Sequence, residues 1–277
     1  MTNLIIGESS NLSRSLKNIL PNTKIVAAHL LKDNADMLFP FIKTPINIIF
    51  NNFQTATLLN DVHNPADYIK RSVMVTANVL QFIVDHPIDV QKIIYTSSSA
   101  VYGSNVFCSE TDPLNPLSLH ASLKIANEKL VSDVCKANNI DYTIARVFNM
   151  YGGDDRFSII SKIIRCYREN ATLNLINHGN AIRDFIHIED VCRIYDALLP
   201  LRNMPVVNVG TGEGTSVKSL LLFLQLHGIR IKTDNIVRDE LKTSTANSTL
   251  LLEILGKDFR FGKVEDYLLD TLSIGPR

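Results

Sequence analysis

The chain has 277 residues, and its 28 basic and 28 acidic side chains give a formal net charge of zero. This balance gives no reason to expect a nucleic-acid or membrane-surface partner. Hydrophobic residues make up 45% of the chain, but no apolar run reaches the roughly eighteen residues of a membrane span. The composition predicts a soluble globular protein of one domain or of two closely merged domains.

The cysteine and histidine spacings argue against a disulfide framework and against a metal site. Cys108, Cys135, Cys166 and Cys192 are widely spread and include no Cys-x-x-Cys pair, which is typical of free thiols in a reducing cytoplasm. The histidines are scattered and include no His-x-x-x-His pair, so no metal is expected. The N-terminus enters an apolar strand pattern directly, without the regions of a signal peptide. We therefore predict a cytoplasmic protein.

Apolar runs of strand length alternate with helical patterns along the first half of the chain. The predicted strands are residues 3–6, 24–28, 46–50, 91–96 and 142–146, and the predicted helices are residues 12–19, 68–84 and 118–137. Residues 30–44 are expected to form a loop with one or two helical turns. Such alternation predicts βαβ units, and hence an α/β fold with a parallel sheet and helices on both of its faces.

The second half of the chain is less regular. A helix at residues 157–169, a short strand near Leu173 and a polar turn at residues 178–180 are followed by a strand–helix pair from Phe185. A strand at residues 206–209, a glycine-rich turn and a helix from Ser216 come next. This half is interpreted as a smaller substrate domain that partly returns to the first half.

Hydroxyl side chains follow the fourth predicted strand, and a helix starts about twenty residues later. The strand ends in Thr96, Ser97, Ser98 and Ser99, and ligands of parallel sheets bind at the carboxyl ends of the strands. In the helix that begins near Ser118, His120 and Lys124 are four residues apart and share one face. If the strand end faces this helix, a hydroxyl, an imidazole and an ammonium group form a proton-handling site.

The stretch Ser97-Ser-Ser-Ala-Val-Tyr-Gly103, followed by a helix with Lys124, resembles the extended short-chain dehydrogenase/reductases of the NAD-dependent epimerase/dehydratase family. These enzymes modify nucleotide sugars. The resemblance implies that Ser98 polarises the sugar oxygen, with Ser99 beside it, and that Lys124 is the catalytic lysine. The position of the family's catalytic tyrosine is occupied by His120, where this sequence departs from the pattern.

Three later segments are also similar to this family. Arg146-Val-Phe-Asn-Met-Tyr-Gly152 implies that Asn149 lies against the substrate diphosphate. Arg183-Asp-Phe-Ile-His-Ile-Glu-Asp190 implies that Arg183 pairs with phosphate, a task that suits the planar fork of a guanidinium. The stretch 208–212 matches the family's Asn-Val-Gly-x-Gly segment. Each segment also has a structural interpretation, such as a local Arg183–Asp184 ion pair or a simple strand-to-helix turn.

The resemblance implies a Rossmann-type doubly wound parallel sheet with a smaller α/β substrate domain. We place the dinucleotide-binding domain at residues 1–152 and 184–215, and the substrate domain at residues 153–183 and 216–277. The family commonly dimerises through two long helices, which here correspond to residues 68–84 and 118–137. A homodimer is therefore predicted, although the apolar residues of these helices would also suit packing on the sheet.

The loop after the first strand is the predicted phosphate site. The family pattern Gly-x-x-Gly-x-x-Gly reads Gly7, Ser10 and Ser13 here. Small residues and the amino end of a helix suit a diphosphate, so Gly7, Ser10, Asn11 and Leu12 are predicted cofactor contacts. Alternatively, Ser9 or Ser10 only caps the helix.

Other cofactor contacts are predicted at the ends of the neighbouring strands. Asn51, Asn52, Thr96 and Lys124 are assigned to the cofactor, although the two asparagines would equally serve as turn residues. After the second strand, Asp33 would favour NAD, whereas Lys32 and His29 would favour NADP. The sequence leaves this choice between NAD and NADP open.

His120 affects the predicted mechanism. The family's tyrosine has an ordinary pKa near 10 and needs a nearby cation, whereas an imidazole starts near 6.5 and exchanges protons without that help. We expect Lys124 to keep His120 neutral. The catalytic residues are thus predicted to be Ser98, His120 and Lys124.

The predicted activity is NAD(P)-dependent reduction of a nucleoside-diphosphate 4-keto-6-deoxysugar in polysaccharide biosynthesis. A one-way reductase exchanges its cofactor at every turnover, so it tolerates a phosphate loop with fewer glycines. The alternatives are a nucleotide-sugar 4-epimerase and, in another class, an inactive nucleotide-sugar-binding protein. A dehydratase is disfavoured because Ser98-Ser-Ala100 lacks both carboxylates that family dehydratases place there.

Overall fold

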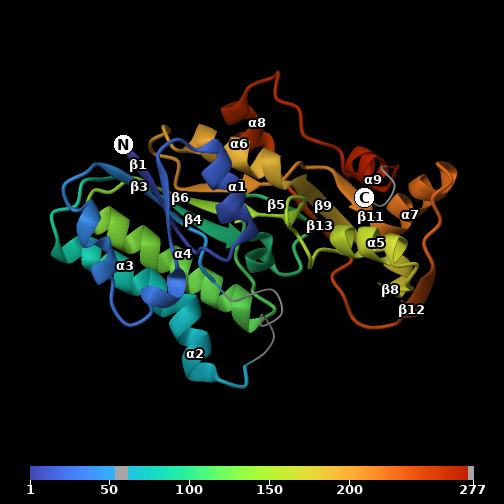
Figure 1. Ribbon diagram of the computed structural model, residues 1–277, viewed down its shortest axis with the longest axis horizontal. Coiled ribbons are helices and arrows are strands. Elements are labelled where there is room, and N and C mark those ends of the chain that lie inside the picture. The colour runs from blue at the N-terminus through green and yellow to red at the C-terminus, as the bar shows by residue number, and fades with distance from the viewer. Residues whose placement is uncertain (54–61, 274–277) are drawn as a thin grey trace. The chain divides into compact units, whose positions relative to one another are not determined.

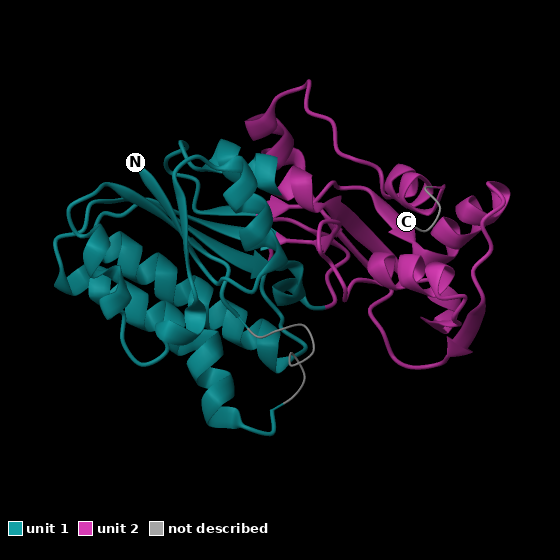
Figure 2. Ribbon diagram, in the orientation of Figure 1, with its two compact units in different colours: residues 1–103, 113–146, 192–207 teal, residues 104–112, 147–191, 208–277 magenta. Residues whose placement is uncertain are grey.

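The computed structural model describes residues 1–53 and 62–273. The chain divides into two compact units, shown in different colours in Figure 2. Unit 1 contains residues 1–103, 113–146 and 192–207, and unit 2 contains residues 104–112, 147–191 and 208–277. The predicted division into cofactor and substrate domains concerns ligands and stays a prediction, and residues 274–277 of that substrate domain lie outside the described part.

Unit 1 is built on a six-stranded sheet with the order β10-β6-β4-β3-β1-β2. The pairings β1–β2, β1–β3 and β3–β4 are parallel. All five residues of β3 are buried, as expected for a strand covered on both faces. The strands are β1 (Thr2–Ile6), β2 (Thr23–Val26), β3 (Ile46–Phe50), β4 (Val90–Ser98), β6 (Tyr142–Val147) and β10 (Val206–Val209). The predicted doubly wound α/β sheet is confirmed.

Helices cover both faces of this sheet: α3 and α4 lie on one face, and α1 and α6 on the other (Figure 1). The helical segments are α1 (Asn11–Ile19), α2 (Pro65–Ile69), α3 (Val75–Asp85), α4 (Leu119–Ala137) and α6 (Ile188–Leu198). Short helical turns lie at η1 (Ala28–Leu30), η2 (Asp36–Phe41) and η5 (Ser99–Tyr102). The predicted helix at residues 68–84 is interrupted by η4 (Lys70–Met74), a single π-helical turn.

The second strand is shorter than predicted. Its pairing with β1 ends at Ile6–Val26, because Gly7 turns out of the strand with a φ of 119°. Residues beyond Val26 have no strand to pair with there and enter η1 instead.

Unit 2 contains a five-stranded sheet with the order β11-β9-β13-β5, in which β7 also pairs with β9, and a two-stranded sheet of β8 and β12. Its strands are β5 (Phe107–Cys108), β7 (Asn149–Tyr151), β8 (Leu173–Ile176), β9 (Ile182–His187), β11 (Gly214–Ser216), β12 (Thr233–Ile236) and β13 (Thr243–Ala246). Its helices are α5 (Ile159–Arg168), α7 (Val217–Leu226), α8 (Thr249–Leu255) and α9 (Val264–Ser273), with a turn at η6 (Asn177–Gly179). The two-stranded sheet and the last two helices were not predicted.

Two negative predictions concern the described residues. None of the helices described here has both the length and the apolar character needed to cross a bilayer. Within the same residues, no group of three or more His, Cys, Asp and Glu side chains could hold a metal ion. All four cysteines are buried thiols.

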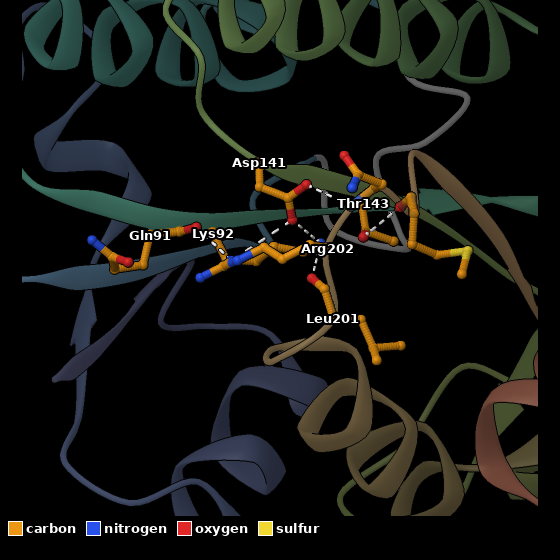
Figure 3. A network of polar contacts seen from close by, with 8 residues as sticks. Gln91, Lys92, Asp141, Thr143, Leu201 and Arg202 are labelled. Carbon is orange, nitrogen blue, oxygen red and sulfur yellow. Dashed lines mark hydrogen bonds and ion pairs between the residues drawn. The ribbon is translucent and has the colours of Figure 1, made fainter.

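The amino-terminal edge of the sheet in unit 1 is held by a buried lysine. The side chain of Lys92 is fully buried, and its Nζ donates to Asp141 Oδ2 at 2.5 Å and to the Leu201 carbonyl at 2.8 Å. Figure 3 shows Lys92 and Arg202 pointing toward the same carboxylate. Burial lowers the pKa of Lys92, and the hydrogen bond to Asp141 opposes that shift. This network joins β4, the start of β6 and the segment before β10.

We predict that Asp141→Asn lowers the free energy of unfolding by about 3 kcal/mol, because it leaves the buried Lys92 ammonium without a counter-charge. Chemical denaturation of the purified protein measures the change. The matched control is Asp133→Asn, since Asp133 forms an exposed pair with Lys129 on α4 and its removal should leave the stability unchanged. Equal effects of the two variants would contradict this account of Lys92.

Candidate active site

The hydroxyl-rich end of β4 runs into a tight turn that also holds the entry to α4. Ser98 Oγ accepts a hydrogen bond from Ala100 N at 3.2 Å and so caps η5. Gly103 follows with a φ of 63°, and Asn115 N donates to the Val101 carbonyl at 3.0 Å. A Cβ atom at Gly103 would lie 1.9 Å from the Asn115 carbonyl oxygen. The segment leading into α4 therefore packs directly on the turn after β4.

His120 lies in the first turn of α4 and is partly buried. Its Nδ1 is 3.0 Å from Ser118 Oγ, the residue that caps this helix. Burial lowers the pKa of His120 below its ordinary value, and the positive charge of Lys124 lowers it further. Both effects favour the neutral imidazole, which is the direction expected from the sequence.

Lys124 is 8% exposed, and its ammonium group lies against the end of β4. Nζ donates to the Thr96 carbonyl at 2.7 Å. It also lies 4.4 Å from the ring centroid of Phe53 and 5.0 Å from that of Tyr95. Burial lowers the pKa of Lys124 to about 7, and the negative charge of Glu128 opposes this effect. Two side chains one helical turn apart thus titrate at or below neutral pH.

A third ionisable residue, Glu128, continues the stripe formed by His120 and Lys124 on α4. Arg146 donates to it from Nη2 at 2.8 Å and from Nε at 3.2 Å, and Ser97 Oγ also donates to it. Arg146 Nη1 in turn donates to Tyr102 Oη at 2.9 Å. Glu128 was not among the predicted site residues, although its position four residues after Lys124 indicated that it lies on the same face of the helix.

The loop after β1 lies at the point where the order of the sheet changes direction, since β2 pairs on one side of β1 and β3 on the other. Dinucleotides bind at such points. Ser10 caps α1 by accepting from Ser13 N at 3.4 Å, so the capping interpretation holds for this residue. Asn11 and Leu12 form the first turn, where backbone N–H groups favour an anion. The Leu12 side chain is buried, which leaves only its backbone for a ligand.

Position 13, where the family pattern has a glycine, holds a serine whose hydroxyl takes part in a chain of hydrogen bonds. Ser13 is fully buried, and its Oγ accepts from Asn51 Nδ2 at 3.2 Å. Asn51 Oδ1 accepts from Thr96 Oγ1, which lies 2.8 Å from Tyr195 Oη. The hydroxyl of Ser13 is thus matched by a specific partner, and the amide of Asn51 ties α1 to β4. Tyr195 and Ser13 were not among the predicted site residues.

The neighbouring Asn52 is suited to a ligand contact. Its Nδ2 donates to Thr76 Oγ1 at 3.3 Å, whereas its buried Oδ1 has no hydrogen-bond partner among the described residues. A buried carbonyl oxygen of this kind is normally satisfied by a water or a ligand. Together with the α1 amino end, this acceptor fits a bound dinucleotide.

The residues that could select between the two nicotinamide cofactors do not converge. The exposed Asp33 forms an ion pair with Lys70 at 3.0 Å, and this hydrogen bond lowers the pKa of the carboxyl group. His29 is exposed in η1, and Lys32 is partly buried. The structure leaves the choice between NAD and NADP where the sequence left it.

Asn149 and Arg183, the predicted phosphate contacts, lie in unit 2 on the paired strands β7 and β9. Asn149 Nδ2 donates to the Asp184 carbonyl at 3.1 Å. The Arg183 guanidinium lies 3.8 Å from Glu240 and donates to the Ile182 carbonyl at 2.8 Å. The alternative interpretation, a local Arg183–Asp184 ion pair, does not match these contacts, because the buried Asp184 accepts hydrogen bonds from Thr211, Gly212 and Ala246.

The chain is similar to known proteins in sequence and in fold. The model of the NAD dependent epimerase/dehydratase family matches residues 8–210. A putative UDP-glucose 4-epimerase of Methanocaldococcus jannaschii is 29% identical over 73% of this chain and 67% of its own length. A GDP-6-deoxy-D-talose 4-dehydrogenase of Aggregatibacter actinomycetemcomitans is 27% identical over 74% of this chain and 72% of its own. The matched segments cover between 51% and 72% of the length of the curated relatives that this chain resembles.

Solved structures share the fold. The UDP-glucuronic acid 4-epimerase from Bacillus cereus, in complex with UDP-glucuronic acid and NAD, has a TM-score of 0.83 at 21% identity, covering 97% of this chain and 96% of its own. The UDP-glucose 4-epimerase of Thermus thermophilus, in complex with NAD, has a TM-score of 0.82 at 17% identity and covers 98% of each chain.

We predict that Gly103→Ala destabilises the protein and disrupts the entry to α4, because the new Cβ would collide with the Asn115 carbonyl. Thermal unfolding checks this prediction. Gly228→Ala is the matched control, since Gly228 has a positive φ of 82° but a Cβ added there would have nothing within 4 Å. It isolates backbone strain from the collision. A melting temperature lowered equally by both substitutions would argue against the collision.

A second prediction concerns Lys124, which keeps its proton up to about pH 7 in the folded chain and up to about 10.5 in the unfolded chain. Between these pH values the unfolded chain binds more protons, so the free energy of unfolding rises with pH by about 1.4 kcal/mol per unit. The parent should therefore gain roughly 2 to 3 kcal/mol over Lys124→Met between about pH 7 and about pH 9. Denaturant titrations at several pH values measure this difference. Lys129→Met, on the exposed side of α4, should show no such trend, and parallel curves for Lys124→Met would disprove the assignment.

Proposed function

Because this chain belongs to the NAD-dependent epimerase/dehydratase family, we propose that it interconverts nucleoside-diphosphate sugars at carbon 4 with a bound NAD. The observation that carries this proposal is the contact of Lys124 with the hydroxyl end of β4, with His120 one helical turn away and under the influence of the Lys124 charge. A group that exchanges protons near neutral pH and a hydroxyl that polarises an oxygen are what oxidation of a secondary alcohol requires.

The proposed cofactor site is the carboxyl edge of β1, β3 and β4. The α1 amino end at Asn11 and Leu12, the Gly7–Ser10 loop and the Asn52 amide would hold the dinucleotide. When bound, the nicotinamide supplies or accepts a hydride. Lys124 would contact the nicotinamide ribose. We favour NAD over NADP because the family is described as NAD dependent, and separate titrations with the two cofactors test this choice.

His120 is the proposed proton acceptor from the sugar hydroxyl. Its neutral state near pH 7 leaves a ring nitrogen able to take a proton, and burial together with Lys124 maintains that state. Ser98 would donate its hydroxyl hydrogen to the sugar oxygen, with Ser99 beside it, because the hydrogen bond from Ala100 N uses a lone pair of Oγ and not that hydrogen. We assign the substrate diphosphate to Asn149 and Arg183.

Two alternatives remain distinguishable by one assay. Reduction of a 4-keto-6-deoxysugar is supported by the similarity to a GDP-6-deoxy-D-talose 4-dehydrogenase. The loss of glycines from the phosphate loop supports this reductase only weakly, because Ser13 is held by a hydrogen bond from Asn51. An inactive sugar-binding protein is the other alternative. Incubation with a panel of nucleotide sugars separates the three: epimers form without net NADH, a reductase consumes NADH, and a binding protein does neither.

We also propose a cytoplasmic homodimer that acts in polysaccharide biosynthesis, with the contact formed by the helices from Pro65 to Asp85 and α4. Ile69 and Met74 are 40% and 39% exposed on the first of these helical segments, which gives the contact an apolar component. Sedimentation of the full chain tests the oligomeric state.

We predict that His120→Gln lowers kcat by on the order of 10²- to 10⁴-fold, the usual contribution of a general base. In the parent, kcat/KM for oxidation should fall only below an apparent pKa under 6.5, because the folded protein disfavours the imidazolium. His120→Tyr should keep activity and move this limb to higher pH, since a phenol has an ordinary pKa near 10.

The control for this series is His227→Gln, which removes an exposed histidine of unit 2 and should leave kcat unchanged. Wild-type turnover by His120→Gln would exclude His120 as the proton acceptor. Absence of turnover in the parent across the whole panel would exclude the proposed enzyme.

A further inference from the structure

Ser118 makes two contacts with one oxygen. As the N-cap of α4, its Oγ accepts a hydrogen bond from Ala121 N at 3.4 Å. The same Oγ lies 3.0 Å from His120 Nδ1. The cap that starts the helix therefore also contacts the imidazole two residues later, whereas no described residue forms a hydrogen bond with the other ring nitrogen, Nε2.

The direction of this second hydrogen bond determines what Nε2 can do. A hydroxyl has one hydrogen and two lone pairs, and a neutral imidazole carries its proton on either nitrogen. If Ser118 accepts from Nδ1–H, the bond persists in the neutral ring and in the imidazolium, because Nδ1 carries a proton in both states. If Ser118 donates to Nδ1, a proton taken up by Nδ1 forces the hydroxyl to turn and accept instead. Only the first arrangement keeps the same hydrogen bond unchanged through a proton exchange at Nε2.

We propose that Ser118 is a positioning residue that holds His120 as the Nδ1–H tautomer, so that Nε2 is the nitrogen that accepts and returns the substrate proton. This inference rests on the proposed function of His120. It assigns to Ser118 a role that the helix cap alone does not require, since capping uses only the acceptor lone pair directed at Ala121 N.

The position of His120 explains why such a contact is needed. An imidazole is shorter than the phenol that the family places here, so its orientation decides whether a nitrogen reaches the substrate. The neighbouring Lys124 lowers the stability of the imidazolium, and an acceptor at Nδ1 partly offsets this by bonding to the charged ring. Ser118 provides that acceptor without a negative charge that would pair with Lys124.

The test is the tautomer of His120 in the full chain without ligands, read from nitrogen-15 NMR of protein labelled in its seven histidines. The His120 signals are identified by their loss in His120→Gln. At a pH above the imidazole pKa, the parent should show a protonated Nδ1 and an unprotonated Nε2. Ser118→Gly should shift the ring toward the Nε2–H form, because it removes the acceptor.

The variants separate positioning from helix capping. Glycine is tolerated at the N-cap at a cost of a few tenths of a kcal/mol, so Ser118→Gly remains folded. Ser118→Thr keeps the hydroxyl and should restore the parent tautomer. Ser122→Ala is the matched control, because among the described residues Ser122 Oγ bonds only to the Ser118 carbonyl, at 3.2 Å on the exposed side of the same turn. Kinetically, Ser118→Gly should lose on the order of tenfold in kcat with little change in KM.

An Nε2–H ring in the parent, or the same tautomer in the parent and Ser118→Gly, would overturn the inference. Because the NMR measurement needs no substrate, its outcome is independent of turnover. If the tautomer shifts as expected but the parent converts no nucleotide sugar, the proposed enzyme fails while the positioning of His120 by Ser118 stands.

Discussion

The buried ion pair between Arg146 and Glu128 is the interaction on which the candidate site depends. The two side chains are 6% and 8% exposed, and they join β6 to α4. Through Ser97 and Tyr102, the same charges also reach β4 and η5. A buried carboxylate without a partner would cost several kcal/mol, so α4 can dock on the sheet only where Glu128 meets Arg146. That register places Lys124 beside the end of β4, with His120 one helical turn before it on α4.

The same register sets the electrostatics of the site. Because Glu128 is paired with Arg146, it only partly stabilises the Lys124 ammonium. Burial lowers the pKa of Lys124 to about 7. The charge of Lys124 then disfavours a proton on His120. His120, Lys124 and Glu128 thus lie at successive turns of α4. Glu128, which is paired with Arg146, affects the pKa of Lys124, and Lys124 affects the pKa of His120, the group proposed to exchange protons. This coupling gives a physical reason why an imidazole can occupy the position of a phenol.

The carboxyl edge of β1, β3 and β4, the proposed cofactor site, shows how substitutions that weaken a motif are compensated within the fold. Serine at position 13 would be an unsatisfied buried hydroxyl in a conventional phosphate loop. Here the Asn51 amide donates a hydrogen bond to the Ser13 hydroxyl and accepts one from Thr96. The serine at position 13 is therefore accompanied by hydrogen-bond partners after β3 and in β4. Gly7 is kept at a position where a side chain would collide, because its Cβ would lie 2.9 Å from the Asn51 carbonyl group. The glycine pattern is thus altered at Ser13, where a hydrogen-bond partner is present, and retained at Gly7, where two backbone segments are in close contact.

Several features of this protein could be predicted from its sequence alone. Buried parallel strands read as apolar runs and helices as 3.6-residue patterns, so β3, β10 and α4 were predicted within one residue of their observed ends. The pairing of His120 with Lys124 on one face followed from helix geometry. The short strands β11, β12 and β13 were not predicted, because three or four residues are too few to carry a periodic signal, whether they are partly exposed as in β11 and β12 or mostly buried as in β13. Tertiary structure alone decided the partners of Asn51, Glu128 and Asp184, since a hydrogen bond between residues distant in the chain depends on which strands become neighbours, and local pattern does not encode that choice.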